Sequence, residues 1–423
     1  MRILMIGWEF PPMKIGGVGE VTYHIIKELD ARGHEVILLL PKANDAVVKY
    51  FYDSFRHAHL IAANIPFQKI PGRPFGTYTE VVARFIVKSG RVVKEILGYT
   101  ASDFEKVALA YAAFVRNLLR ELPMDVDVIH AHDWLTVPAA LEAKSILDKP
   151  LILHIHSTTY DRSGTTIRHY VNDPNVYAYF PDYYWECLGV SVADRVVAVS
   201  RRIKDLLVKY DKAEPEKVVV IYNALPERLQ ALNKVIKHKF KKKEKIVLYV
   251  GRMSLHKGPD WFLRYAKRVL EKRKDVLFVM VGKGEMLPQL MNLAAELGIS
   301  KHVIFTGFLS EPEKEALYDL ADVFVLPSVS EPFGLTPFEA LAHGVPVVIS
   351  KQSGVAEILR DAPKADFWDV DKMANYILAL LEYETLNGVV KERAVQQMLS
   401  IKWSDVVDQL EKIYSDLAKK TRS

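Results

Sequence analysis

The sequence predicts two α/β domains, each built around a parallel β-sheet. Its 423 residues exceed what one hydrophobic core usually serves, because single cores stop growing at about 250 to 300 residues. Short β-branched segments alternate with longer helical patterns, which is typical of repeated βαβ units with buried strands. The alternation starts afresh near Lys245, so we expect the second domain to begin there.

The expected strands fall into two series. In the first half they cover residues 3–7, 35–40, 126–130, 151–154, 195–199 and 217–221. In the second half they cover residues 246–250, 277–281, 303–306, 323–326 and 345–350, with helices such as 261–272 between them. The last segment, 403–417, has the apolar spacing of a helix and could cross back onto the first domain.

These patterns give the expected division of the chain. It has a first domain at 1–233, a connector at 234–245, a second domain at 246–400 and a C-terminal helix at 401–423. The connector is rich in lysine and has few apolar residues. A run of like charges is usually a solvated surface segment, and the functional alternative is an arm that binds nucleic acid.

Composition excludes several classes of protein. Half of the residues are apolar and 26% are charged, which is ordinary for a globular protein and not for a disordered or fibrous one. The net charge of +5 is mild, so nucleic-acid binding is not expected. Cys187 is the only cysteine and cannot form an internal disulfide. No apolar run reaches the roughly 18 residues of a membrane span, and no signal-peptide pattern precedes the first strand, so we expect a cytoplasmic protein. The oligomeric state stays open.

A glycine-rich turn follows the first expected strand. Gly16, Gly17 and Gly19 lie between that strand and a helical pattern, where backbone N–H groups can approach phosphate or sugar oxygens. Glycines at such turns can also serve packing alone, so a purely structural role remains the alternative. Their spacing is not G-x-G-x-x-G, which disfavours a nicotinamide-dependent dehydrogenase.

Histidines gather after two neighbouring strands of the first half. Residues 129–134 read IHAHDW, and residues 154–164 read HIHSTTYDRSG. Open α/β sheets bind ligands at the carboxyl ends of their strands, so this position favours function over a purely structural role. The Cys/His pairs of a structural zinc site are missing, and no metal is expected.

The second half carries a cationic turn and an acidic loop. Arg252 and Lys257 lie between a strand and a helix, where they could surround a diphosphate, although a solvated basic turn is the alternative. Glu331 follows another strand, and Glu339 falls in the first turn of the next helix. Backbone N–H groups around 334–336 could hold a phosphate, and Glu339 could accept hydrogen bonds from ribose hydroxyls. An acidic first turn is also ordinary helix chemistry.

Taken together, these segments resemble the glycogen and starch synthases and other retaining glycosyltransferases of the GT-B type. KIGGV at 14–18 looks like their K-x-G-G-L motif, and HDW at 132–134 like their H-D-W segment. Residues 251–258 and 331–339 look like the paired G-R-x-x-x-x-K-G and E-x-x-F-G-x-x-x-x-E motifs. The resemblance covers nearly the whole chain and implies two Rossmann-like domains whose parallel sheets face across a cleft.

The resemblance also implies a role for each matching residue. Catalytic residues would be His132 at the 6-hydroxyl of the transferred glucose, Arg252 and Lys257 at the diphosphate, and Glu331 at the donor sugar's hydroxyls. Donor-binding residues would be Lys14, Gly16, Gly17, Gly282, Phe308, Leu309, Phe333, Gly334, Leu335, Thr336 and Glu339. His156, Asp161 and Arg162 would lie on the acceptor or sugar side. Val18, the NALP segment at 223–226 and Ser353 depart from the family's pattern, which suggests a divergent branch.

The expected activity is transfer of glucose from ADP- or UDP-glucose to the non-reducing end of an α-1,4-glucan, with retention and without a metal or other cofactor. Two D-x-D strings, at 125–127 and 369–371, could suggest the manganese site of the other glycosyltransferase fold, but their positions favour a structural role. Open alternatives are a small-acceptor transferase forming a disaccharide or glycolipid, a nucleotide-sugar epimerase on the same fold, and a glucan-binding or regulatory protein with an inactive site. A PLP-dependent phosphorylase is disfavoured because those enzymes are much longer.

Overall fold

The structure, a computed structural model, describes residues 1–13, 17–65, 78–88, 91–101, 103–163, 166–169, 171–172, 180–226, 229 and 244–422. The chain forms two compact units. The first contains residues 1–160, 166–222 and 403–423, and the second contains residues 161–165 and 223–402. Of the connector expected at 234–245, only residues 244 and 245 are described.

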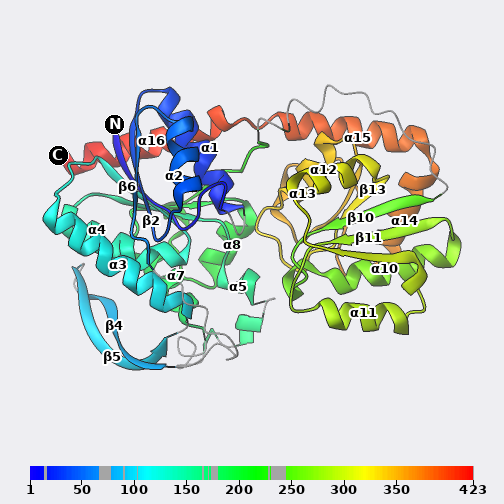
Figure 1. The fold of residues 1–423 in the computed structure, drawn as a ribbon, viewed down its shortest axis with the longest axis horizontal. Helices are drawn as coiled ribbons and strands as arrows, with labels where there is room; N and C mark the ends of the chain where they lie inside the picture. The colour runs from blue at the N-terminus through cyan, green and yellow to red at the C-terminus, as the bar shows by residue number, and fades with distance from the viewer. Residues whose placement is uncertain are drawn as a thin grey trace. The chain divides into compact units, whose positions relative to one another are not determined.

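The first unit is built on a parallel sheet, drawn from blue to green in Figure 1. Within the described ranges, its strands lie in the order β3-β2-β1-β6-β7-β8-β9. Their bounds are β1 Arg2–Ile6, β2 Glu35–Leu40, β3 Ala58–Ala62, β6 Val128–His132, β7 Leu151–Ile155, β8 Arg195–Ala198 and β9 Val218–Val220. The central strands are buried along nearly their whole length because helices cover both faces, so their side chains need no polar alternation.

Helices and one hairpin complete this unit. The helices are α1 Val18–Ala31, α2 Asp45–Ser54, α3 Asp103–Glu121, α4 Val137–Leu147, α7 Pro181–Val192, α8 Arg201–Lys209 and α16 Trp403–Arg422, with 3₁₀ turns η1 Trp134–Thr136, η2 Thr166–His169 and η3 Pro215–Lys217. Helix α5 (Thr159–Arg162) begins in this unit, and its last two residues group with the second. Strands β4 (Tyr78–Lys88) and β5 (Arg91–Ala101) pair antiparallel in a separate two-stranded ribbon. Asn44 and Ser200 cap α2 and α8 by accepting hydrogen bonds from backbone N–H groups.

The second unit repeats the architecture. In the part of the chain that is described, its parallel strands lie in the order β12-β11-β10-β13-β14-β15. The strands are β10 Lys245–Val250, β11 Val276–Val281, β12 Val303–Gly307, β13 Val323–Leu326, β14 Val347–Ser350 and β15 Lys364–Ala365. The helices are α10 Pro259–Lys272, α11 Leu287–Glu296, α12 Glu311–Leu320, α13 Thr336–Ala342, α14 Val370–Glu382 and α15 Glu384–Leu399, with 3₁₀ turns η4 Leu255–Lys257, η5 Ser300–His302 and η6 Gly354–Glu357. Buried residues of β10, β11, α10 and α14 form one core.

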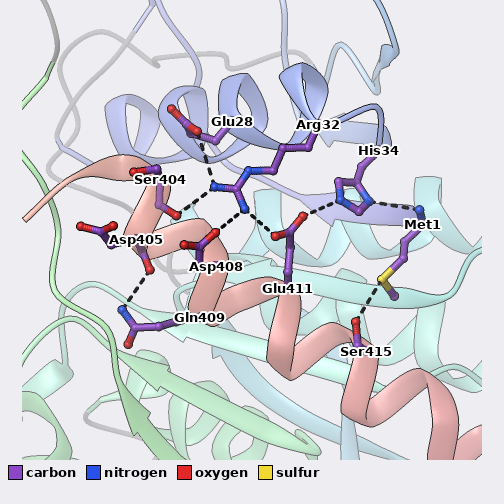
Figure 2. Close-up of polar contacts among 10 residues, drawn as sticks. All are labelled: Met1, Glu28, Arg32, His34, Ser404, Asp405, Asp408, Gln409, Glu411 and Ser415. Atoms are coloured by element: carbon purple, nitrogen blue, oxygen red, sulfur yellow. Dashed lines mark hydrogen bonds and ion pairs between the residues drawn. The ribbon is translucent and has the colours of Figure 1, made fainter.

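Helix α16 packs on α1 although more than 370 residues separate them (Figure 2). The Arg32 guanidinium donates to Asp408 Oδ1 at 2.6 Å and to Glu411 Oε2 at 2.5 Å. His34 Nε2 lies 2.6 Å from Glu411 Oε1, and Trp403 stacks on the buried ring of His24 with 4.8 Å between centroids. Polar and aromatic contacts therefore hold α16 in the first unit.

The strand orders fix where ligands can bind. In each sheet the chain first adds strands on one side of its first strand, which is β1 in the first unit and β10 in the second. It then crosses to the opposite side, where β6 pairs with β1 and β13 pairs with β10. The crevice at the carboxyl ends of the two strands flanking this switch point is the usual ligand site of open α/β sheets. Among the described helices, none is long and apolar enough to cross a membrane.

Candidate active site

The first unit brings four histidines together on neighbouring strands. His130 and His132 end β6, His154 lies opposite His132 on β7, and His156 follows β7. Because side chains alternate along strands, all four lie on one face of the sheet at its carboxyl edge. Each histidine is at most 9% exposed.

Hydrogen bonds orient three of these rings. His132 Nδ1 lies 2.9 Å from His156 Nε2, and His130 Nδ1 lies 2.7 Å from the Tyr414 hydroxyl of α16. Five other ring nitrogens of the four histidines are buried and have no hydrogen-bond partner in the described structure: His130 Nε2, His132 Nε2, His154 Nδ1, His154 Nε2 and His156 Nδ1.

The histidines are neutral at physiological pH. Burial lowers the pKa of His130, His132 and His154 well below the ordinary value, and neighbouring imidazoles lower it further. Burial also lowers the pKa of His156 to about 3, with His130 as the second cause. Desolvation of the charged form is the main reason in each case.

Three of the four histidines lie close enough together to be considered as ligands of one metal ion. One nitrogen each of His130, His132 and His154 lies within 4.8 Å of the others. Their ring planes, however, differ by only 8° to 25° with centroids 4.6 to 5.5 Å apart. A ligating imidazole places the metal in its own plane, because the nitrogen lone pair lies there. A metal ion shared by the three rings would therefore have to lie in all three ring planes at once.

The expected glycine loop is only partly described. Lys14 and Gly16 lie outside the described residues, and Gly17 is the N-cap residue of α1. The N–H of Gly19 already donates to Glu9 Oε1 at 3.1 Å. One backbone N–H group at this helix terminus is thus already bonded to a carboxylate of the preceding loop. The sequence suggested phosphate or sugar oxygens at these N–H groups.

The other residues expected on the acceptor or sugar side lie in α5. Asp161 is buried, and its Oδ1 accepts a hydrogen bond from Ser330 Oγ at 2.5 Å. Arg162, the last residue of α5, is partly buried. Both residues group with the second unit, whereas His156 belongs to the first.

In the second unit, two loops at the switch point bring Lys257 and Glu331 together. The carbonyl of His256 accepts hydrogen bonds from the N–H groups of Val329 and Ser330 at 2.9 and 3.1 Å, which fastens η4 to the loop after β13. Gly258 is required at the end of η4, because a Cβ atom there would lie 2.2 Å from the Pro327 carbonyl oxygen. Burial and the Lys257 charge lower the pKa of His256 to about 4.

Lys257 and Glu331 form a tight ion pair. The Lys257 ammonium lies 2.9 and 2.7 Å from the two carboxylate oxygens of Glu331, and Ser328 Oγ donates to Oε2 at 3.2 Å. The Glu331 side chain is 6% exposed, whereas that of Lys257 is 26% exposed. Arg252 is exposed on the same loop and makes no carboxylate ion pair with any described residue. Among the described residues, the Arg252 guanidinium therefore has no acidic partner, whereas Lys257 on the same loop is held by a buried carboxylate.

Glu339 lies in the first turn of α13 and is held by two residues of α12. Its Oε2 accepts a hydrogen bond from the Tyr318 hydroxyl at 3.0 Å and lies 3.2 Å from the Lys314 ammonium. Burial raises the pKa of Tyr318 well above its usual value, and the Glu339 charge raises it further. One carboxylate oxygen is thereby fixed, and the other is left to accept a hydrogen bond from a ligand.

The remaining residues expected to bind the donor line the same edge of the second sheet. Gly282 directly follows β11 with φ of 134°, and a Cβ there would lie 2.0 Å from the Gly251 carbonyl oxygen. Phe308 follows β12 and is 73% exposed, and Leu309 is partly exposed beside it. Phe333, Gly334, Leu335 and Thr336 lead into α13, with Phe333 buried.

The sequence missed several partners of these residues. The Tyr414 hydroxyl on His130, and Tyr318 and Lys314 on Glu339, come from helices far along the chain, so no local motif reveals them. The pairing of His132 with His154 was readable in part, since histidines at every second position on two adjacent strands must share a face.

Comparisons with known proteins identify the family. The family described as "Starch synthase catalytic domain" matches residues 2–218, and "Glycosyl transferases group 1" matches residues 232–397. A glycosyltransferase of Methanocaldococcus jannaschii is 29% identical over 88% of this chain and 89% of its own length. The glycogen synthase of Mycobacterium tuberculosis is 27% identical over 84% and 80%, and the D-inositol 3-phosphate glycosyltransferase of Corynebacterium aurimucosum is 27% identical over 77% and 81%.

Solved structures agree on the fold. The structure of Anabaena HepE in complex with UDP-glucose covers 99% of this chain and 100% of its own with a TM-score of 0.66 at 20% identity. The two parallel sheets and the matched motifs of both halves are those of one enzyme class. The chain therefore belongs to the starch synthase catalytic-domain family and is a glycosyltransferase of the GT-B type.

Proposed function

We propose that the protein transfers glucose, with retention and without a metal, from ADP- or UDP-glucose to the non-reducing end of an α-1,4-glucan. The observation that carries the proposal is the loop at the switch point of the second sheet, where exposed Arg252 accompanies the Lys257–Glu331 pair. Two cations on one loop can stabilise a departing diphosphate through charge-assisted hydrogen bonds. A starch synthase domain in the first half and a glycogen synthase among the relatives support the glucan.

Each residue has a role in this proposal. Arg252 and Lys257 bind the diphosphate, Glu331 binds hydroxyls of the donor sugar as well as Lys257, and Glu339 binds the ribose with its free oxygen. His132 contacts the 6-hydroxyl of the transferred glucose. In the second unit, backbone N–H groups at 334–336 hold the distal phosphate, and Gly282, Phe308 and Leu309 flank the base. UDP-glucose in the related HepE structure supports a nucleotide-sugar donor.

The chemical step is a substitution at the anomeric carbon. The bond from that carbon to the diphosphate oxygen breaks, and its electron pair leaves with the diphosphate. The acceptor hydroxyl forms the new bond on the same face and gives its proton to the leaving phosphate. The protein supplies electrostatic stabilisation and no covalent nucleophile.

Transfer to defined acceptors tests the proposal. Radiolabelled ADP-glucose and UDP-glucose would each be incubated with glycogen, maltose and glucose, with and without EDTA. We expect chain extension on glycogen that EDTA does not abolish. We also expect Arg252→Ala to lower kcat/KM by about a hundredfold, the usual cost of removing one positioned donor. No extension of any glucan, or complete loss of transfer with EDTA, would contradict the proposal.

A small acceptor is the second candidate. Several relatives are D-inositol 3-phosphate glycosyltransferases, and one of them covers 98% of this chain at 26% identity. The same assay with inositol phosphate and lipid acceptors separates the two functions. Conversion of the donor with no acceptor present would instead point to an epimerase, which the sequence left open.

A further inference from the structure

His156 lies behind His132 and does not line an open surface. Its ring is buried and joined to His132 by the 2.9 Å contact between Nε2 and Nδ1. The two ring planes differ by 17°, and their centroids are 5.2 Å apart. The centroids can be no farther apart than the N···N distance plus the distance from each nitrogen to its own ring centre. The observed separation is close to that maximum, so the two centroids and the two nitrogens lie nearly on one line and the hydrogen bond lies in the plane of both rings. This is the favourable direction for an N–H donor and a nitrogen lone pair.

We propose that His156 is a positioning residue that fixes the tautomer of His132. Its Nε2–H donates to His132 Nδ1, so that His132 carries its own proton on Nε2. This inference rests on the proposed function only in assigning His132 to the sugar. The tautomer itself is a property of the resting protein.

The direction of the hydrogen bond follows from the atoms that meet. One direction places both protons on Nε2, and the opposite direction places both on Nδ1. Neutral histidine in water prefers the Nε2–H form, so only the first direction leaves both rings in their preferred state. The partner on one ring nitrogen sets the tautomer of the other nitrogen. Tyr414 repeats the pattern at His130, where its hydroxyl faces Nδ1 at 2.7 Å.

The backbone around His156 holds the two rings at this distance. Asp133 directly follows His132, and its Oδ1 accepts hydrogen bonds from the N–H groups of His156 at 2.6 Å and Ser157 at 3.3 Å. One carboxylate thus ties the loop after β7 to the loop after β6. Asp133 itself adopts φ of 58°, a left-handed conformation that a non-glycine residue rarely keeps without such contacts.

The consequence is a defined chemistry at His132 Nε2. That nitrogen is buried and has no hydrogen-bond partner among the described residues. As a neutral N–H it donates to a hydroxyl oxygen, and it cannot accept the hydroxyl's proton. His132 is therefore a donor that selects for an oxygen at its position on the sugar, and not a general base.

Nitrogen NMR of the ring nitrogens in the full chain tests the tautomer directly. The protein would be labelled with ¹⁵N-histidine, and the His132 signals would be assigned by their loss in His132→Asn. We expect His132 in the Nε2–H form in the wild type and in His156→Gln, whose amide can donate from the same place. In His156→Leu, His132 Nδ1 loses its donor, so the Nδ1–H form should appear beside the Nε2–H form that neutral histidine prefers. An Nδ1–H form in the wild type, or an unchanged His132 in His156→Leu, would overturn the inference.

Kinetics gives a second readout. We expect kcat to fall about tenfold or more in His156→Leu and to recover to within about threefold of wild type in His156→Gln, with the donor KM little changed. The exposed His57→Leu serves as the matched control in the same unit. Equal loss in the Gln and Leu variants would contradict a positioning role. If the enzyme transfers to no glucan, the proposed function fails while the NMR result still decides the tautomer.

Discussion

Replacing Lys257 by methionine removes the ammonium and keeps most of the side-chain volume. In the wild type this ammonium contacts both oxygens of Glu331, and the Glu331 side chain is only 6% exposed. The substitution should therefore have two separate effects. The diphosphate loses a cation during the reaction. Among the described residues, the nearly buried Glu331 carboxylate then keeps only Ser328 as a side-chain hydrogen-bond donor.

The two effects have different sizes. Loss of one positioned charged donor costs about 3 kcal/mol in the transition state, which lowers kcat about 150-fold. Breaking a buried ion pair costs about 3 to 5 kcal/mol of stability. Here we expect about 2 kcal/mol, because water reaches the Lys257 side chain, which is 26% exposed. Adding Glu331→Gln removes the unpaired charge, so the double variant should regain most of the stability and none of the kcat.

Two assays on four proteins separate these effects. Nucleotide release with saturating donor gives kcat, and guanidinium unfolding followed by circular dichroism gives the free energy of unfolding. Wild type, Lys257→Met and the double variant would be compared with Lys301→Met, which removes an exposed lysine from the same unit. If Lys257→Met keeps kcat within about threefold of wild type, the assignment of Lys257 to the leaving group is wrong.

Three further predictions concern single contacts. Tyr318→Phe removes one of the two hydrogen-bond donors to Glu339 Oε2. In initial-rate measurements it should raise the KM for the nucleotide sugar about threefold to tenfold with little change in kcat, and an unchanged KM would mean that Tyr318 does not orient Glu339. Tyr414→Phe leaves a buried nitrogen of His130 without its partner and should lower the free energy of unfolding by about 1 to 2 kcal/mol in guanidinium, whereas Ser415→Ala beside it should change it little. The four buried histidines have lowered pKa values, so below pH about 6.5 the unfolded chain binds more protons than the folded one. As the pH falls further, the free energy of unfolding should decrease by about 1.4 kcal/mol per pH unit for each histidine that stays neutral in the fold. Unfolding curves at pH 7.5 and 5.5 check this, and equal stabilities at the two values would show that the cluster is protonated in the fold.

The sequence predicted the two-domain α/β fold and most of the buried strands. The expected strand at 35–40 coincides with β2, and that at 323–326 with β13. Strand β3 was missed because its AHLIA sequence is partly exposed and gives no continuous apolar run. The ribbon of β4 and β5 was missed as well, since its antiparallel pairing interrupts the βαβ alternation on which the prediction relied.

The surroundings of the expected site residues were not predictable from the sequence. The sequence predicted a strand ending at His130, but β6 continues to His132, so His132 also lies within the strand. Both histidines are tolerated there because β7 brings His154 and His156 alongside and burial keeps every ring neutral. Glu339 was expected to meet the ribose, whereas half of its carboxylate is held by α12. Such partners depend on packing between distant segments, which spacing in one sequence does not reveal.

The location of α16 constrains the order in which the protein can fold on the ribosome. Residues 403–422 are synthesised after all of residues 223–402, yet they pack against α1 and His130 in the first unit. The nascent second unit is therefore complete while the first still exposes the surface that α16 covers. During that interval the buried faces of His24 and His130 lack their aromatic neighbours, and a chaperone that recognises apolar surface would find its target in the half of the protein that emerged first.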